Sequence, residues 1–280
     1  MNSLTNEIKN LLNKDYTEVA PRGLRVHEYL NEEMILDSTK PFSSFEQRPF
    51  NFKYFAGELL WYLCGDFKTE FIGNFSNFWN NLTDKNGEIN SNYGNIMLNK
   101  QFVYAYKSLV NDKFSRQAII NINGKEHQKP TKDFPCTLNI LFYIRDNKLN
   151  MRILMRSQDI FYGLQYDVPW YAFVHQNMYL LLKEVYPELE LGQYIHKMDN
   201  VHYYERHFDL VESIKKETHD KYHTLELLKP IITIEDNKAV VNNQIYDEYI
   251  KFKYEIPNWK FTEWKNYLNN LGFFNIKLKK

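Results

Sequence analysis

The stretch TLNILFYI-RDNK-LNMRILMR, residues 137–156, decides the fold class of this chain. Its first and last eight residues are rich in β-branched, aromatic and other apolar side chains, as in strands. The four polar residues between them, 145–148, are typical of a turn. Two strands joined by a short polar turn form a β-hairpin, so the sequence predicts antiparallel sheet at this point.

Outside the hairpin, most of the readable segments are helical. Apolar residues recur every three or four positions in residues 3–13 and 51–64, which predicts two helices, the second one buried and ending near Gly65. The other expected elements are a strand over 118–122, a short helix over 70–82, a buried helix over 168–186 and a helix over 203–216. We therefore expect an α+β fold with one mainly antiparallel sheet covered by helices. We expect a single domain over residues 1–280, with a divergent, polar tail over about 218–280.

Composition excludes several classes of protein. The chain has 280 residues, with 35 Lys+Arg against 35 Asp+Glu, so no global basic field attracts nucleic acid. Two cysteines cannot build a disulfide framework. The first residues, MNSLTNEIKNLLNK, do not resemble a signal peptide, and no apolar run is long enough to span a bilayer. We expect a cytoplasmic protein with neither nucleic acid nor membrane as a partner.

Of the two cysteines, Cys136 is the better candidate for chemistry. It follows Pro135 at the start of a predicted strand, where a cysteine is usually a small buried side chain and only occasionally a reactive thiol. Cys64 lies at the end of an apolar helix, and we expect it to be structural.

Four blocks of sequence, taken together, favour a catalytic role for Cys136. They are GELLWYLCGD (57–66), Pro135-Cys136, RSQDIFYGLQYD (156–167) and HYY (202–204). In this order and spacing they resemble the thymidylate synthase family, whose marks are an E-L-L-W-F-L-x-G-D helix, a P-C-H strand start, an R-S-x-D-x-x-x-G-x-P-x-N loop and a D-x-H-x-Y segment. The resemblance covers roughly residues 1–216. It implies a thymidylate synthase-like fold in which one face of the sheet is used for dimerisation.

Three departures point to one branch of that family. Thr137 stands where the family has His, Asp167 where it has Asn, and Asn200 where it has Asp. Cys136-Thr137, Met155-Arg156-Ser157 and the closing Asp167 look like the phage dCMP hydroxymethylase branch rather than thymidylate synthase proper. The segments 87–94 and 202–207 are also similar to that branch.

The resemblance assigns catalytic roles to three residues. Cys136, as a thiolate, would add to C6 of a pyrimidine and make C5 nucleophilic. Glu58 would organise water near the base as an acid/base group, although a helix Glu can also simply reach solvent. Asp167 would read the base. A guanidinium next to the thiol, for which Arg156 is the candidate, would favour the thiolate; by its type alone, Arg156 could equally form a surface ion pair.

The resemblance also implies two sets of binding residues. The nucleotide set comprises Arg22, Arg116, Arg156, Ser157, Asp159, Asp167, His202 and Tyr204. In it the arginines and Ser157 hold the phosphate, His202 and Tyr204 hold the sugar 3′-hydroxyl, and Arg116 reaches across a homodimer although Gln117 replaces the family's second arginine. The folate set comprises Arg48, Trp79, Asn92 and Asp159, and the implied co-substrate is 5,10-methylenetetrahydrofolate. No spacing of histidines argues for a metal site.

Asp167 bears on the choice of substrate. Uracil presents an N3–H donor and an O4 acceptor, which an amide matches, whereas cytosine presents an N3 acceptor and an amino donor. A protonated Asp has one donor and one acceptor to match cytosine, and an ionised Asp suits N3-protonated cytosine. A site built on such pairing discriminates strongly between bases.

Three readings of function remain open on the sequence. The leading one is a hydroxymethylase that converts dCMP, or CMP, to its 5-hydroxymethyl derivative. The second is a thymidylate synthase that methylates dUMP, and the third is a non-catalytic nucleotide-binding protein that keeps the fold. The C-terminal residues GFFNIKLKK differ from the family's short apolar closing tail, which fits an enzyme that admits water. For a viral protein, the expected location is the host cytoplasm.

Overall fold

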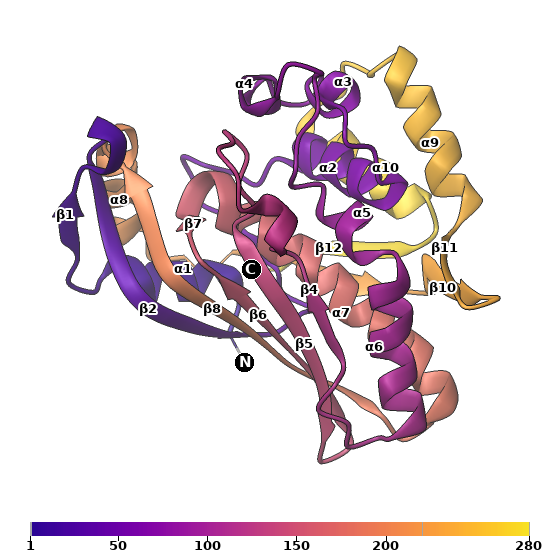
Figure 1. Ribbon diagram of the computed structural model, residues 1–280. Coiled ribbons are helices and arrows are strands. Elements are labelled where there is room, and N and C mark those ends of the chain that lie inside the picture. Colours follow the sequence, from indigo (N-terminus) through magenta and orange to yellow (C-terminus); the bar gives the residue numbers. More distant parts are fainter. Residues whose placement is uncertain (1, 220, 280) are drawn as a thin grey trace.

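One large sheet and a cluster of helices make up the computed structural model, which describes residues 2–219 and 221–279 (Figure 1). The large sheet contains β1 (Thr17–Val19), β2 (Val26–Leu36), β8 (Glu190–Tyr204), β6 (Lys148–Met155), β5 (Thr137–Arg145) and β4 (Ile119–Asn121), in that order. The short β7 (Gln158–Asp159) pairs with β8 off this path. Neighbouring strands are antiparallel except where β8 pairs with β6 and β7. The expected α+β architecture with a mainly antiparallel sheet is confirmed.

The predicted hairpin lies at the centre of this sheet. β5 and β6 pair from Thr137↔Met155 to Arg145↔Lys148, and their turn places Asp146 and Asn147 in the left-handed region at φ 51° and 55°. Asn and Asp tolerate that conformation better than most residues, which explains why the polar turn is easy to recognise in the sequence.

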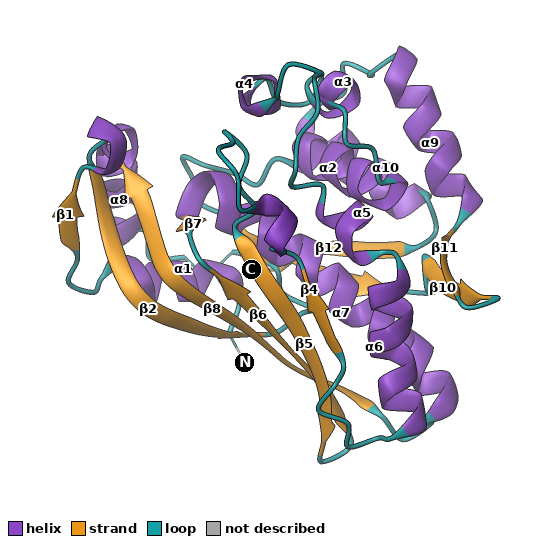
Figure 2. Cartoon of the chain, in the orientation of Figure 1, coloured by secondary structure: helices purple, strands orange, loops and turns teal. Residues whose placement is uncertain are grey.

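The helices gather on one side of the sheet (Figure 2). They are α1 (Leu4–Leu12), α2 (Phe52–Cys64), α3 (Thr69–Ile72), α4 (Phe78–Leu82), α5 (Tyr93–Met97), α6 (Lys100–Asn111), α7 (Gln165–Val185), α8 (Phe208–Lys216), α9 (Asn243–Tyr254) and α10 (Phe261–Asn270). Among the described residues, no helix is both long and apolar enough to cross a membrane.

Helix α2 is enclosed by other helices rather than lying on the surface. It contacts α3, α5, α9 and α10, so nearly all of its residues are buried and its sequence is apolar on every face. The side chain of Asn51 caps its first turn, and Gly65 ends it at φ 65°. The prediction of a buried helix over 51–64 is confirmed, and so are the helices predicted over 3–13 and 168–186.

Two of the predicted helices differ from the structure. The single helix expected over 70–82 is two short helices, α3 and α4, because the chain turns between them after Gly73. The helix expected over 203–216 begins only at Phe208. Residues 203 and 204 complete β8, and residues 205–207 form a single 3₁₀ turn. Apolar spacing alone does not reveal these breaks, since local turn hydrogen bonds produce them.

The tail of the chain is ordered and joins the N-terminal half. β9 (Tyr222–Leu227) lies between β12 (Phe274–Lys279) and β3 (Phe42–Ser43) in a three-stranded sheet, and β10 (Ile232–Glu235) pairs with β11 (Lys238–Val241). Trp264 of α10 is 1% exposed and packs edge-on against Phe75. Helices α9 and α10 of this tail therefore help to enclose α2, the helix that carries Glu58.

Candidate active site

Cys136 lies immediately before β5, in the loop that approaches α5. Its backbone N–H donates to the hydroxyl of Tyr93 (3.3 Å), and its carbonyl accepts from the N–H of Arg156 (2.9 Å). These two contacts fix the backbone on both sides of the thiol. The side chain is half-buried, at the edge of the hydrophobic core.

The guanidinium of Arg156 is held beside the thiol by main-chain carbonyls. Its Nε donates to the carbonyl of Pro135 (3.0 Å), and its Nη2 donates to that of Phe134 (2.7 Å) and lies 3.6 Å from the Cys136 sulfur. Nη1 has no hydrogen-bond partner in the described part of the chain. Arg156 thus has a fixed orientation with one amino group left to bind an anion.

Two opposing effects set the pKa of the thiol. Burial raises the pKa of Cys136 to about 11, while the charge of Arg156 lowers it; the carboxyls of Asp167, Asp133 and Asp159 raise it further. The expected effect of Arg156 is present, but burial is larger, so the thiol is protonated at neutral pH. A nucleophilic role for this thiol would therefore require removal of its proton.

Glu58 is a buried carboxyl with one close partner. Its side chain is 5% exposed, and its Oε1 accepts a hydrogen bond from Tyr54 (2.6 Å), whose own hydroxyl accepts from the indole N–H of Trp79 (3.0 Å). Burial raises the pKa of Glu58 to about 8, against the effect of the Tyr54 hydroxyl; the charge of Asp167 contributes to the rise. Glu58 therefore carries a proton at neutral pH and can give it up at little cost.

Asp167 is a second carboxyl with a shifted pKa. Its Oδ2 accepts from the side-chain amide of Gln158 (2.7 Å). Burial raises the pKa of Asp167 to about 7; the Gln158 bond opposes the rise and the charge of Asp159 adds to it. At neutral pH the group can therefore act either as a hydrogen-bond donor and acceptor or as an acceptor alone.

Asp159 is anchored by one oxygen and leaves the other unused. Its Oδ1 accepts from the N–H groups of Phe161 (2.7 Å) and Tyr162 (2.6 Å), which caps the turn that leads into α7. Its Oδ2 is buried and has no hydrogen-bond partner among the described residues. A buried carboxylate oxygen without a partner is costly, and a ligand that donates a hydrogen bond would remove that cost.

His202 is oriented by a chain of polar side chains on the sheet. Its Nδ1 lies 2.9 Å from Oδ1 of Asn200, and the amide nitrogen of Asn200 donates to Glu28 (2.6 Å). Because the Asn200 amide gives its N–H to Glu28, its oxygen accepts from His202 Nδ1–H, and Nε2 is left as an acceptor. Asn200, where the family has Asp, thus still fixes the tautomer of His202.

Tyr204 and Arg22 lie next to this histidine. The ring of Tyr204 stands edge-on to that of His202, with 5.4 Å between centroids, and Cys136, Asp159, Arg22 and Arg206 all affect its pKa, which burial raises. Arg22 is a non-glycine residue in the left-handed region, at φ 54°. The charges of Arg22 and Asp159 act on His202 in opposite directions, while burial lowers the pKa of its imidazole.

Three of the four residues expected to bind folate have contacts that link them to other residues described above. The guanidinium of Arg48 lies over the rings of Phe161 and Tyr162 and donates to Gln165 (2.8 Å). Trp79 is bonded to Tyr54 next to Glu58. Asp159 carries the unpaired oxygen.

Asn92, the fourth of these residues, is placed differently. It is fully buried, its amide donates to the carbonyls of Trp61 and Asp66, and its oxygen caps α5. With every polar atom engaged inside the protein, Asn92 holds α5 against α2 and offers nothing to a ligand in this conformation.

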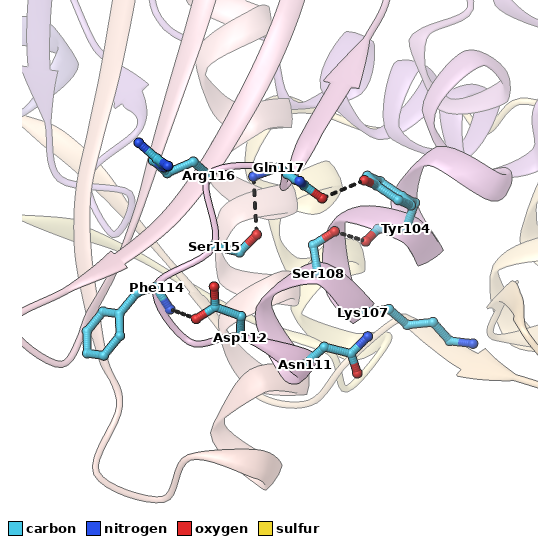
Figure 3. Close-up of a pocket in the computed structure, with 9 residues that line it drawn as sticks. All are labelled: Tyr104, Lys107, Ser108, Asn111, Asp112, Phe114, Ser115, Arg116 and Gln117. Carbon is cyan, nitrogen blue, oxygen red and sulfur yellow. Dashed lines mark hydrogen bonds between the residues drawn. The ribbon is translucent and has the colours of Figure 1, made fainter.

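Arg116 lies apart from Cys136, on the loop between α6 and β4. Figure 3 shows it at the rim of a cavity of about 480 Å³ that is lined by residues of α6 and this loop, including Tyr104, Lys107 and Asp112. Its side chain is exposed and extends away from the other labelled residues. Within a single chain Arg116 is therefore not part of the group around Cys136.

Several residues of the site carry no motif that sequence reasoning could use. Gln158, His196, Tyr54 and Tyr93 all bond to the predicted residues or to each other. The one available signal was the position of Gln158 inside RSQD, between two residues already chosen. No group of three or more His, Cys, Asp or Glu side chains within residues 2–219 and 221–279 is placed to hold a metal ion.

Comparison with known proteins agrees with this geometry. The family model described as thymidylate synthase matches residues 3–256. Deoxycytidylate 5-hydroxymethyltransferase of Enterobacteria phage T6 is 28% identical over 223 residues, which cover 75% of this chain and 88% of the relative. The protein of the same name from Enterobacteria phage T4 is 27% identical over 75% of this chain and 88% of its own length. That from Enterobacteria phage T2 is 27% identical, over 72% and 85% respectively.

Proposed function

Because the chain belongs to the thymidylate synthase family, we propose that it is a hydroxymethylase that converts dCMP to its 5-hydroxymethyl derivative with methylenetetrahydrofolate. The family and its relatives indicate a folate-dependent one-carbon transferase. The choice of cytosine, of the deoxy sugar and of the hydroxymethyl product is the finer part of the proposal.

Asp167 is the observation that carries the choice of base. It stands at the position where the family has Asn, its pKa is raised to about 7, and it lies close enough to Cys136 and Glu58 to affect the pKa of both. A carboxyl that is neutral or ionised at similar cost can pair with cytosine before or after its N3 is protonated. The names of the phage relatives support the same choice.

The rest of the nucleotide meets groups that are already oriented. Nη1 of Arg156 and the guanidinium of Arg22 would hold the phosphate, together with Ser157, which follows Arg156 in the turn between β6 and β7. Nε2 of His202 would accept a hydrogen bond from the sugar hydroxyl, and Tyr204 lies next to it. Because these groups are held by other parts of the protein, little ordering cost remains on binding.

Cys136 would act as the nucleophile. As the thiol loses its proton, its sulfur forms a bond to C6 of the pyrimidine, the C5–C6 double bond opens, and the electron pair makes C5 nucleophilic. The positive charge of Arg156, 3.6 Å from the sulfur, stabilises the thiolate while it forms. After C5 has gained its new carbon and lost its proton, tetrahydrofolate would leave, water would add to the exocyclic carbon, and re-formation of the C5–C6 double bond would expel the thiolate.

Glu58 would move the protons of the later steps. Its pKa of about 8 lets it hold a proton at rest and release it to a neighbouring group. Tyr54 keeps one oxygen of Glu58 in place, so the other is available to water or the base. In a hydroxymethylase water adds to the exocyclic carbon while the sulfur is still bonded to C6, and a buried acid/base group is needed to activate that water.

The side chains near Glu58 suit a folate. Arg48 and Trp79 offer a cation and an aromatic wall, and the unpartnered Oδ2 of Asp159 is an acceptor for the N–H groups of a pterin ring. When bound, methylenetetrahydrofolate supplies the one-carbon unit. We do not include Asn92 in this set because its amide is fully engaged within the protein.

We also propose that the active form is a homodimer that pairs through the outer face of the large sheet. On that face a row of side chains crosses five strands, from Ile119 through Leu141, Arg152 and Ile195 to Ile35. Ile119 and Ile35 are 37% and 42% exposed, which is unusual for isoleucine side chains. A second copy would cover this row, and Arg116 of each chain would then reach the phosphate site of its partner.

The reaction is tested by product analysis. The protein is incubated with methylenetetrahydrofolate and each of dCMP, CMP, dUMP and UMP, and the nucleotides are analysed by mass spectrometry. The proposal expects a hydroxymethyl product that forms fastest from dCMP, without dihydrofolate. Dihydrofolate and dTMP from dUMP would identify a synthase instead, and no turnover of any substrate would indicate a binding protein. The expected cytoplasmic location stays a prediction.

Asp167→Asn tests the base contact directly. An amide can accept from uracil N3–H and donate to O4, so the variant should shift preference from dCMP toward dUMP at nearly constant side-chain volume. Loss of one charged pairing corresponds to about ten- to a hundredfold in relative rate. The measurement is the ratio of kcat/KM for the two nucleotides. Equal losses with both would show that Asp167 does not read the base.

A further inference from the structure

A chain of three buried hydrogen bonds leads from the sheet to Asp167. The hydroxyl of Tyr194 lies 2.6 Å from Nδ1 of His196, Nε2 of His196 lies 2.9 Å from the amide oxygen of Gln158, and the amide nitrogen of Gln158 donates to Oδ2 of Asp167 (2.7 Å). Tyr194 and His196 are fully buried and Gln158 is 2% exposed. Tyr194 and His196 belong to β8 and Gln158 to β7, and the side chain of each has its polar atoms committed to the next.

The three hydrogen bonds of this series all run in the same direction, from donor to acceptor toward Asp167. Burial lowers the pKa of His196 to about 3, so the imidazole is neutral and carries a single N–H. Since the amide oxygen of Gln158 can only accept, that N–H is on Nε2, and Nδ1 accepts from the Tyr194 hydroxyl. In this arrangement the Nε2–H of His196 donates to the Gln158 amide oxygen, and the amide nitrogen is left to donate to Asp167.

Gly163 makes room for this contact. A Cβ atom at Gly163 would lie 2.4 Å from the amide nitrogen of Gln158 and 3.2 Å from Oδ2 of Asp167. Any other residue would press against both members of the hydrogen bond. The backbone of the turn before α7 and the side chain from β7 are thus fitted to each other around Asp167.

The direction of these hydrogen bonds matters because a neutral carboxyl has no fixed order of donor and acceptor. Its proton can sit on either oxygen, so it can present donor and acceptor in either order and pair with cytosine or with uracil. An N–H that donates to Oδ2 disfavours a proton on that oxygen and leaves it on Oδ1. The carboxyl can then present its donor and its acceptor in only one order.

We propose that Gln158, held by His196 and Tyr194, is the positioning residue that fixes which oxygen of Asp167 carries the proton and thereby sets the discrimination between cytosine and uracil nucleotides. The inference rests on the proposed function, since it assumes that Asp167 faces the base. It adds a second layer of specificity behind the residue that contacts the substrate.

Gln158→Met is the direct test. It removes the donor at similar side-chain length, and kcat/KM and the dissociation constants for dCMP and dUMP are measured in the full-length protein. The ratio of the two specificity constants should move toward one by about ten- to a hundredfold, because one hydrogen bond to a charged or partly charged group is lost. The ratio of the dissociation constants should move in the same direction.

Gln176→Met is the matched control. Gln176 is likewise buried (4% exposed) and donates to the carbonyls of Ser38 and Leu225, but it lies far along α7 and has no contact with Asp167. This variant should lose stability and leave the ratio unchanged. If both variants change the ratio equally, the effect of Gln158 is merely structural and the proposal is wrong.

Gln158→Glu keeps the shape of the side chain and serves if the Met variant does not fold. A carboxyl lacks the obligatory N–H, so this variant should also bring the ratio closer to one. An unchanged ratio in either folded variant overturns the proposal. A wild-type preference for dUMP would overturn the proposed function alone, since a shift toward one in Gln158→Met would still support the role of Gln158.

Discussion

Single residues around Cys136 have unusual protonation because they are buried, not because they are highly charged. The thiol and two carboxyls all have raised pKa values, with burial as the main cause in each case. The protons of Cys136 and Glu58 are therefore in place at neutral pH before the substrate arrives. A site that starts with protonated groups must move protons in step with bond formation, which is characteristic of general acid–base catalysis.

Cys136→Ser should abolish turnover and leave nucleotide binding largely intact. In the proposed mechanism the sulfur would act in the chemical step, whereas the arginines and His202 would supply most of the affinity. Turnover by mass spectrometry and the dissociation constant for dCMP are the two measurements, with Cys64→Ser as the control because Cys64 lies at the end of α2 and is expected to be structural. Activity of Cys136→Ser within tenfold of wild type would remove Cys136 from the role of nucleophile.

Glu58→Gln should make the free energy of unfolding of the protein less sensitive to rising pH. The pKa of Glu58 is about 8 in the folded protein against 4.5 for the free side chain, so the folded state holds its proton where the unfolded state has lost it. Its contribution to stability is therefore greatest below about pH 4.5 and falls as the pH rises to 8, by up to about 1.4 kcal/mol per pH unit.

Urea unfolding at pH 5 and pH 8 measures this effect. The variant keeps an oxygen for Tyr54 and lacks the charge, so its free energy of unfolding should exceed that of wild type by more at pH 8 than at pH 5. Glu126→Gln, a change at an exposed carboxyl, is the control. An identical pH dependence in wild type and Glu58→Gln would mean that Glu58 is ionised in the folded protein.

At the scale of elements, the site depends on how α2 and α5 pack. A Cβ atom at Gly94 of α5 would lie 1.7 Å from the carbonyl oxygen of Tyr62 in α2, so the two helices meet backbone to backbone. The same helix begins with Tyr93, whose hydroxyl accepts from the N–H of Cys136. The contact between two helices thus determines where the nucleophile stands.

Gly94→Ala should destabilise the protein and slow turnover together. A backbone atom cannot move aside as a flexible side chain does, so overpacking costs about 1–3 kcal/mol or more and displaces Tyr93. Chemical denaturation and kcat are the measurements. Gly124→Ala is the control, since its Cβ would meet only the movable carboxylate of Glu126; equal effects of the two variants would contradict the argument.

At the scale of the whole molecule, the outer face of the large sheet is uncovered, and Arg116 lies apart from Cys136. The row from Ile119 to Ile35 on that face and the outward-pointing Arg116 suggest a second copy of the chain, which would resolve both features. Symmetric pairing of one face with itself is the commonest route to a homodimer.

Mixed dimers test this arrangement. Arg116→Ala and Cys136→Ser should each be almost inactive alone, but a mixture that is unfolded and refolded together should recover activity. In a mixed dimer one site combines an intact Cys136 with the partner's intact Arg116. Sedimentation gives the oligomeric state. A fully active monomer, or no recovery on mixing, would contradict the shared site.

The sequence by itself determined the hairpin and the buried helix α2, because each depends on residues near one another in the chain, and four ordered blocks singled out Cys136, Arg156 and Asp167 as candidates. Turn residues, apolar spacing and ordered motifs are local signals. The sequence does not predict the long strands β2 and β8, because polar and apolar residues are mixed on both of their faces.

Only the tertiary structure decided what surrounds those residues. Gln158 reaches His196 across 38 positions, Arg48 reaches Gln165 across 117, and Asn92 turns inward to hold two helices. The polar tail, whose sequence predicts no helix or strand, packs around α2 in the structure. The physical reason is that burial and hydrogen-bond pairing depend on which distant segments meet, and it is burial that raises the pKa values of the thiol and the two carboxyls.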